Sequence, residues 1–168
     1  MVDEILFEGL CLRPWKEEDV EIYLQLIQGK SILKNLRNTM PCTKEMFAAF
    51  VGDKSVQNGV YHYAIEKERQ IIGGITFSEE SDNRIELGGF WIAEKFREQG
   101  LGKKVTKALM EYVSRKYQGY TIFVRILSFN QGPINIVTSL GFEYREDLND
   151  EIPSRGKSVL LLYYEIRN

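Results

Sequence analysis

The sequence predicts one domain of the α/β class, and three observations lead to that prediction. The chain has 168 residues, which suits one domain of roughly 100–200 residues. Hydrophobic residues make up 43% and the formal net charge is only −2, which excludes a chain that is mainly disordered. Apolar residues recur with strand spacing in some segments and with helix spacing in others. No linker, repeat or low-complexity block separates these segments, so we expect a single domain over residues 1–168.

The first third of the chain predicts one strand and two helices. Residues 5–15 are typical of a strand, and residues 19–27 carry apolar side chains at helical spacing. A second, short helix is expected after Pro41, with Thr43 as its N-cap. The side chains of this helix that we expect to face inward are those of Met46, Phe47 and Phe50.

The middle of the chain predicts an antiparallel meander. Residues 61–65, 70–77 and 84–92 are rich in apolar and β-branched residues. Polar turns at 66–69 and 79–83 separate them, as hairpin connections do.

The last third predicts two helices and three strands. Residues 100–116 form the clearest amphipathic helix, and residues 121–127 are a buried strand. A short helix over 133–140 is expected to end at Gly141, a residue type favoured just after a helix. Strands over 142–144 and 159–166 complete the domain.

Two further expectations concern the end of the chain. The polar segment Arg145–Lys157 contains Pro153 and Gly156, which indicates a long loop. The apolar strand Val159–Tyr164 offers an edge on which a homodimer could form.

Composition narrows the class of function. The balance of 22 Lys and Arg against 24 Asp and Glu excludes a general nucleic-acid binder. Cys11 and Cys42 are too few for a disulfide framework and are most simply core or surface thiols. No signal peptide or apolar run of ~20 residues is present, so we expect a cytoplasmic protein without a membrane partner. No His, Cys and carboxylate spacing predicts a metal site.

The segment between the meander and the clearest helix predicts an anion site. It reads Arg97-x-x-Gly100-x-Gly102 and leads directly into the helix. Glycines at a helix start let a ligand approach the backbone, and the free N–H groups and helix dipole favour an anion there. Further cations surround this start: Lys103, Lys104 and Lys107.

Two common phosphate loops do not fit this segment. A P-loop would need glycine at Arg97 and Ser or Thr at Lys104, and the dinucleotide fingerprint would need glycine at Val105. The simpler alternative is a loop glycine followed by a solvated lysine face. The coincidence of strand, arginine, two glycines and helix favours a phosphate or pyrophosphate site.

At these residues the sequence resembles the GCN5-related N-acetyltransferase (GNAT) superfamily. Its acetyl-CoA signature, Gln/Arg-x-x-Gly-x-Gly/Ala, is matched by Arg97-Glu-Gln-Gly-Leu-Gly. Three other segments are similar to the branch that acetylates ribosomal-protein N-termini. They are Leu12-Arg-Pro-Trp-Lys-Glu-Glu-Asp, Ile85-Glu-Leu-Gly-Gly-Phe-Trp-Ile, and Asn130 followed by Gly141-Phe142.

The resemblance implies a fold and an activity. The fold is a single GNAT-like α/β domain with a mixed, mostly antiparallel sheet of about seven strands and about four helices. Its sheet splays between the fourth and fifth strands, here 84–92 and 121–127. The activity is direct transfer of acetyl from acetyl-CoA, the co-substrate, to a primary amine without a metal. The acceptor is either a peptide, as a protein N-terminus, or a small molecule, as a polyamine or an aminoglycoside.

Two alternatives stay open on the sequence alone. One is a non-catalytic acyl-CoA-binding regulatory module, and the other is a structural α/β interaction domain. Val137 stands where many members carry a tyrosine acid, and Pro133 stands where the branch usually has a small residue. The general acid therefore has no assigned residue.

The resemblance also places the co-substrate residue by residue. The backbones of Phe90, Trp91 and Ile92 would pair with the pantetheine arm, and Asn130 would contact that arm or help to splay the strands. Backbone amides would hold the pyrophosphate at Arg97, Glu98, Gln99, Gly100, Leu101, Gly102 and Lys103.

Glu86 is the candidate catalytic base. It precedes Phe90 by four residues, and partial burial would raise its pKa toward a useful range. The alternative is an exposed strand carboxylate paired with a lysine. A backbone N–H near Gly88-Gly89-Phe90 would polarise the carbonyl, particularly at a bulge. The single histidine, His62, is expected to be structural or exposed rather than a base.

Acidic residues gather in predicted loops, where they are usually solvated. Near an acceptor site they would favour a cationic amine. They are Glu79, Glu80, Asp82, Glu146, Asp147, Asp150 and Glu151.

Overall fold

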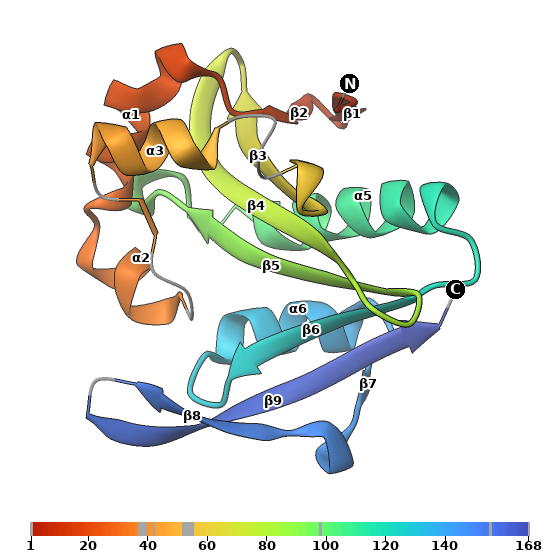
Figure 1. The fold of residues 1–168 in the computed structure, drawn as a ribbon. Helices are drawn as coiled ribbons and strands as arrows, with labels where there is room; N and C mark the ends of the chain where they lie inside the picture. The colour runs from red at the N-terminus through yellow and green to blue at the C-terminus, as the bar shows by residue number, and fades with distance from the viewer. Residues whose placement is uncertain are drawn as a thin grey trace. The chain divides into compact units, whose positions relative to one another are not determined.

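The computed structural model describes residues 2–36, 40–41, 43–51, 56–97, 99–154 and 156–167. They form two compact units (Figure 1). The first unit holds residues 1–79 and 88–101, and the second holds 80–87 and 102–168. One functional domain over residues 1–168 stays a prediction.

The first unit contains an antiparallel set of strands. Each strand is hydrogen-bonded to the next in chain order, and β5 ends in this unit. The strands are β1 (Ile5–Phe7), β2 (Leu10–Pro14), β3 (Val60–Lys67), β4 (Gln70–Glu80) and β5 (Arg84–Ile92). The meander predicted over 61–92 is confirmed.

The single strand expected over residues 5–15 is wrong, because a tight turn divides it. Phe7 pairs with Leu10, and the two residues between them, Glu8 and Gly9, have φ values of 41° and 78°. Both central residues of this hairpin turn therefore occupy the left-handed region, as its tightest form requires. Glu-Gly is a weaker turn signal than Asn-Gly or Asp-Gly, which is why the sequence did not reveal it.

Helices of the first unit pack on an aromatic core. They are α1 (Val20–Ile27), preceded by a 3-10 turn at Glu17–Asp19, then α2 (Lys30–Asn35) and α3 (Lys44–Phe50). Figure 1 shows all three on the same side of β4. The core joins side chains from these helices to side chains from the strands; its buried members are Trp15, Tyr23, Ile27, Ile32, Phe47, Ala64 and Trp91.

The predicted start of α3 is confirmed, but the prediction that all three of its apolar side chains face inward is wrong for one of them. The Met46 N–H donates to the Thr43 hydroxyl at 3.2 Å, which caps the helix. Phe47 is 1% exposed, but Met46 is 40% exposed and lies on the outer side. Helix α2 was not predicted, and Cys42 lies outside the described residues.

A buried ion pair fastens the start of α1 to β2. Arg13 donates to both carboxylate oxygens of Asp19, at 2.8 and 3.0 Å, and to Glu66 at 2.9 Å. Burial alone would raise the pKa of Asp19, but the hydrogen bonds from Arg13 and from the Lys16 N–H together hold that pKa below its ordinary value. The Leu12–Asp19 motif therefore has a structural role here.

The second unit continues from the beginning of β5. Its strands follow the order β5, β6, β9, β7, with β8 also paired to β9. The elements are α5 (Leu101–Lys116, in this unit from Gly102), β6 (Thr121–Leu127), α6 (Gln131–Ser139), β7 (Glu143–Tyr144), a 3-10 turn at Glu146–Leu148, β8 (Asp150–Ser154) and β9 (Lys157–Arg167).

Strand β5 pairs with β6 in parallel, and this pairing is short. It runs from Arg84 opposite Thr121 to Glu86 opposite Phe123. It ends where β5 passes into the first unit. The mixed, mostly antiparallel sheet that we predicted is confirmed; the described residues form nine strands and five α-helices rather than about seven and about four.

Two expectations about the C-terminal part are wrong. Arg145–Lys157 is not a long loop, because Asp150–Ser154 forms β8 with β9 as its partner. Pro153 is tolerated at this edge position. Val159–Tyr164 is not a free edge, since β9 pairs with β6 on one side and with β8 and β7 on the other. Within the part of the chain described here, no helix is both long and apolar enough to cross a membrane.

Candidate functional site

The end of β5 brings the three predicted pantetheine-binding residues into the first unit. The Trp91 side chain is 4% exposed and stacks on Trp15 with ring centroids 6.3 Å apart. The Trp91 carbonyl oxygen lies so close to β4 that a Cβ on Gly73 would be only 2.1 Å from it. The Trp91 indole therefore belongs to the aromatic core. The prediction for Trp91 concerns only its backbone, so this placement of the side chain does not affect it.

Arg97 shapes the loop that leaves β5. Its Nε donates to the Ile92 carbonyl oxygen at 3.0 Å, and the loop between them contains a 3-10 turn at Glu94–Phe96. The sequence predicts that the Arg97 backbone amide binds the pyrophosphate and that its side chain adds a positive charge nearby. The structure adds that its side chain closes the loop on the end of β5.

Two further side-chain contacts hold this loop within the first unit. Lys67 Nζ, at the end of β3, donates to Gln99 Oε1 at 2.9 Å. The Ser31 hydroxyl on α2 donates to Glu94 Oε1 at 2.5 Å. Of the predicted pyrophosphate-binding residues, only Glu98 lies outside the described residues.

Gly100 permits the turn into α5. Its φ is +67°, and a Cβ placed on it would meet no atom within 4 Å. The conformation, rather than lack of space, therefore favours glycine here. Leu101 follows as the first residue of a 16-residue helix, whose N-terminal N–H groups have no partner within the helix itself.

The first turns of α5 carry exposed cations. Lys103, Lys104 and Lys107 are all exposed, and Lys107 lies 3.8 Å from Glu111 across one helical turn. An anion at the helix start would therefore meet backbone donors, the helix dipole and lysine charges.

In the second unit, Glu86 forms an ion pair that the sequence did not predict. Glu86 is 5% exposed. Arg125 donates to both of its carboxylate oxygens, from Nε at 2.9 Å and from a terminal nitrogen at 2.5 Å. The hydrogen bond to Glu86 raises the pKa of Arg125 above its ordinary value. The alternative of an exposed carboxylate paired with lysine is therefore wrong.

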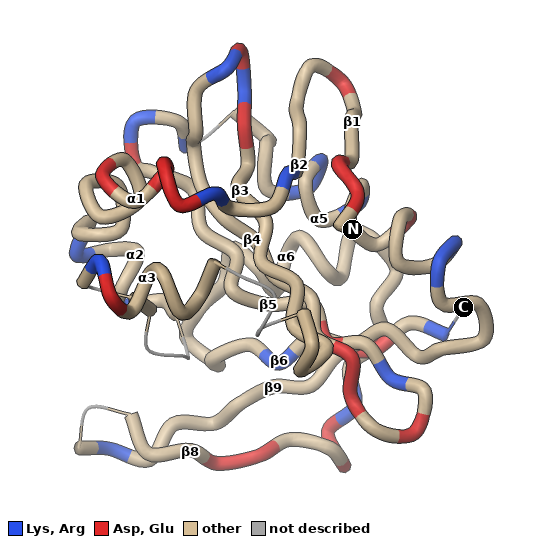
Figure 2. The backbone as a smooth tube through the Cα atoms, turned by 45° about the horizontal axis from the view of Figure 1, so that its top comes forward, with Lys and Arg blue, Asp and Glu red and all other residues tan. Residues whose placement is uncertain are grey.

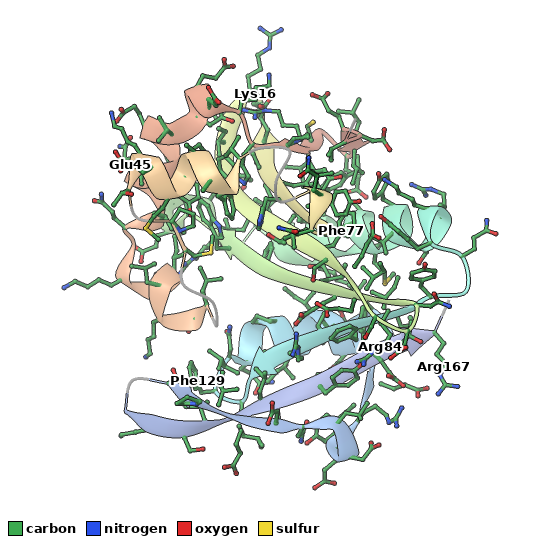
Figure 3. All side chains as sticks on the ribbon, in the orientation of Figure 1. Lys16, Glu45, Phe77, Arg84, Phe129 and Arg167 are labelled. Atoms are coloured by element: carbon green, nitrogen blue, oxygen red, sulfur yellow. The ribbon has the colours of Figure 1, made fainter. Side chains whose placement is uncertain are left out.

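A second arginine lies beside this ion pair. Arg84, labelled in Figure 3, places its guanidinium 4.4 Å from the centre of the Phe123 ring, and the Arg125 guanidinium lies 5.6 Å from the same ring. Arg84 also donates to the Tyr163 hydroxyl at 2.5 Å. Glu86 thus belongs to a dense polar and aromatic network. No pattern in the sequence predicts this network, because its members come from β5, β6 and β9.

Asn130 and Val137 mark the beginning and the middle of α6. The Asn130 N–H donates to the Leu127 carbonyl at 2.8 Å, and Asn130 is the N-terminal flanking residue of the helix. Val137 is 3% exposed. An apolar side chain therefore fills the core at the position where the family resemblance suggested a tyrosine.

His62 connects two strands of the first unit. Its Nδ1 lies 2.9 Å from the Thr76 hydroxyl oxygen, and its ring stacks on Phe50 with centroids 3.7 Å apart. Burial lowers the pKa of His62 to about 4, so the imidazole is neutral at neutral pH. The expectation of a structural histidine agrees with these contacts.

The acidic residues of the predicted loops lie on several elements (red in Figure 2). Glu79 and Glu80 end β4, Asp147 lies in the 3-10 turn after β7, and Asp150 and Glu151 begin β8. Some are held by neighbours: the Tyr61 hydroxyl donates to Glu79 at 2.8 Å. Others are paired with cations, as Asp147 is with Arg145 at 2.9 Å.

The predicted site residues are therefore divided between the units. Phe90 to Leu101 lie in the first, whereas Glu86, Gly102, Lys103 and Asn130 lie in the second. Chain continuity through β5 and through Leu101-Gly102 joins them.

A family model matches most of the chain. The model describes an acetyltransferase (GNAT) domain and matches residues 9–143. The chain is also similar to the spermine/spermidine N(1)-acetyltransferase of Bacillus subtilis (strain 168), with 30% identity over 86 residues. That match covers 51% of this chain and 54% of the relative, so the chain matches about half the length of this curated protein.

Solved structures share the fold over nearly the whole chain. The ribosomal L7/L12 alpha-N-protein acetyltransferase RimL in complex with coenzyme A has a TM-score of 0.83 at 18% identity, covering 98% of both chains. The spermidine N-acetyltransferase of Vibrio cholerae in complex with CoA and spermine has a TM-score of 0.81 at 15% identity, covering 95% of both chains.

Proposed function

Because the chain belongs to the acetyltransferase (GNAT) domain family, we propose that it transfers acetyl from acetyl-CoA directly to a primary amine. The observation that carries this proposal is the turn into α5. Gly100 adopts a left-handed conformation immediately before a 16-residue helix, and lysines line the first two turns. This combination suits a pyrophosphate.

The residues around this turn fit the co-substrate. Amides of residues 97–103 would hold the pyrophosphate, and Lys103, Lys104 and Lys107 would neutralise phosphate charge. The backbone at Phe90–Ile92 would pair with the pantetheine arm as an added strand does. Arg97 keeps the loop closed through its bond to Ile92.

The transfer needs a neutral amine and a polarised thioester. The amine nitrogen attacks the carbonyl carbon, a C–N bond forms, and the C–S bond breaks with its electron pair on sulfur. The amine loses one proton, which Glu86 accepts, and the departing thiolate takes one proton from water. A backbone N–H near Gly89 would stabilise the developing charge on the carbonyl oxygen.

The demand on Glu86 depends on the acceptor. An α-amine with a pKa of ~8 is appreciably neutral at pH 7, whereas removing the proton from an alkyl amine with a pKa of ~10.4 costs roughly 3–4 kcal/mol more. Arg125 donates to both oxygens of the Glu86 carboxylate, so one of these hydrogen bonds must be given up when Glu86 accepts a proton from the amine. An incoming ammonium group could replace Arg125 as the partner of Glu86.

The acceptors that we propose are a polyamine, a protein N-terminus and an aminoglycoside. The named activity of the Bacillus subtilis relative supports the polyamine, and the branch resemblance of Leu12–Asp19 and Ile85–Ile92 supports the N-terminus. A non-catalytic acyl-CoA-binding module is the second candidate, because Val137 replaces the tyrosine acid of many family members.

Two measurements, made one after the other, test the proposal. Acetyl-CoA at 100 times its Kd should stabilise the protein by about 2.7 kcal/mol in thermal unfolding. Release of free thiol is then followed with spermine, an N-terminal peptide and an aminoglycoside. Thiol release with any acceptor supports the enzyme, and stabilisation without release supports the binding module. No stabilisation at millimolar acetyl-CoA contradicts both.

A further inference from the structure

Three residues on successive strands of the first unit form one line of contacts. His62 on β3 and Thr76 on β4 are directly opposite each other in the strand register, and His62 Nδ1 lies 2.9 Å from the Thr76 hydroxyl oxygen. On its other side, that hydroxyl faces Gly89 of β5. A Cβ placed on Gly89 would lie 2.9 Å from the Thr76 hydroxyl oxygen and 3.2 Å from its Cβ.

Gly89 has an unusual conformation for a strand residue. Its φ is +56°, in the middle of a strand that runs from Arg84 to Ile92. The conformation of Gly89 sets the direction of the peptide group that joins it to Phe90. Our proposed function assigns polarisation of the thioester carbonyl to a backbone N–H near Gly89, and this peptide group carries the N–H of Phe90.

The imidazole is fixed from two directions. The Phe50 ring of α3 stacks on it at 3.7 Å and 26°, and Thr76 holds its Nδ1. Because the buried ring is neutral at neutral pH, it has one N–H and one lone pair. Either tautomer can therefore bond to the hydroxyl and fix its direction. A threonine has few favoured side-chain rotamers, so fixing the direction of the side chain also fixes the Oγ1 and Cβ atoms that face Gly89.

We propose that His62 and Thr76 are positioning residues for acetyl transfer, which hold Gly89 in its left-handed conformation and so direct the N–H of Phe90 at the thioester carbonyl. This inference rests on the proposed function. Neither residue touches the reacting atoms; both act through the backbone of β5. Their loss should therefore lower kcat and leave the binding of acetyl-CoA unchanged.

The test compares variants that remove the contact with variants that keep it. Thr76→Val removes the hydroxyl at nearly constant volume, and His62→Phe keeps an aromatic ring against Phe50. We expect each variant to lower kcat about tenfold, which is about ten times less than the effect of removing an oxyanion-hole donor altogether. The KM for acetyl-CoA should stay within about twofold of the wild type. Thr76→Ser should restore kcat to within about twofold of the wild type. The double variant should be no slower than either single variant, since both act on one contact.

A matched control comes from the same pair of strands. Tyr61 neighbours His62 on β3, and its hydroxyl donates to Glu79 at 2.8 Å. Tyr61→Phe removes a hydrogen bond between β3 and β4 without touching Thr76 or Gly89, so its kcat should stay within about twofold of the wild type. If a His62→Phe chain does not fold, His62→Gln replaces the ring by a side chain that still bonds to Thr76.

The outcomes separate this inference from the proposed function. If the wild type turns over and Thr76→Val has the same kcat, the inference alone is overturned. The inference is also overturned if Tyr61→Phe loses as much kcat as Thr76→Val. Equal loss in Thr76→Ser also contradicts it, because the hydroxyl is then irrelevant. Absence of thiol release by the wild type overturns both the proposed function and the inference that rests on it.

Discussion

Glu86 is the residue whose role depends most on its neighbours. It is almost fully buried, and Arg125 holds both of its oxygens. If Glu86 takes the proton of the amine, Glu86→Gln should lower kcat at least tenfold while the Kd for acetyl-CoA stays within about twofold. Steady-state thiol release and calorimetric titration measure the two quantities. Unchanged kcat removes Glu86 from the reaction.

Arg125→Gln is the matched control for this variant. It breaks the same ion pair but leaves the carboxylate in place. A base freed from its arginine should keep or increase kcat at neutral pH. If Arg125→Gln loses as much kcat as Glu86→Gln, then the ion pair matters for structure and the carboxylate does not act as the base.

His62 should resist protonation in the folded protein. Its pKa lies near 4 because burial disfavours the imidazolium, whereas the unfolded value is near 6.5. Between these values the unfolded chain binds a proton that the folded chain does not. The His62 contribution to stability is therefore intact above pH 6.5 and is lost as pH falls toward 4, by roughly 1.4 kcal/mol per pH unit.

Proton NMR can test this directly because the chain has one histidine. The ring C–H resonance should titrate with a midpoint near 4. Urea unfolding at pH 7 and pH 5 supplies the second readout. The wild type should lose more stability between these pH values than His62→Gln, and a midpoint near 6.5 would contradict the burial of the ring.

At the scale of elements, two glycines near the start of α5 have different roles. Gly100 needs its left-handed conformation, whereas Gly102 lies in the first turn of the helix. Gly100→Ala should cost roughly 1 kcal/mol of stability through backbone strain and raise the Kd for acetyl-CoA. Gly102→Ala should leave that Kd within about twofold, because the family signature admits alanine there and alanine favours helix. Calorimetry on both variants measures the difference, and equal weakening would contradict the assignment.

Elements with strong local signals were predicted well, and elements that depend on a neighbour were not. The helix over 100–116 and the strand over 121–127 were predicted within one residue, because apolar spacing and flanking glycines define them locally. β8 was missed, since Pro153 and the acidic residues of Asp150–Ser154 disfavour a strand. Its stability comes from the ladder with β9.

The candidate site shows the same division. The signature around Arg97–Lys103 could be found in the sequence because its residues are consecutive. Arg125 could not be found, because it lies 39 residues from Glu86 and meets it only through the parallel pairing of β5 with β6. The Thr76 hydroxyl likewise reaches His62 only through the register of β3 and β4.

At the scale of the whole molecule, the distribution of charge matters more than its sum. The net charge is −2, yet the first turns of α5 carry three exposed lysines. If local charge governs the binding of anionic acetyl-CoA, the Kd should rise as salt increases from 10 to 150 mM, over which the Debye length falls from about 30 to about 8 Å. If net charge governed, screening would lower the Kd. Calorimetric titration at both concentrations distinguishes the two signs.

The sequence by itself determined the α/β class, the meander, the helix α5 and the family signature that precedes it. Those features arise from residues close together in the chain, where spacing, turn residues and dihedral preferences act locally. Only the tertiary structure decided which side chains meet: Arg125 with Glu86, His62 with Thr76, and Arg13 with Asp19. Strand register and packing bring these groups together from distant positions, and burial then fixes their protonation and their hydrogen bonds.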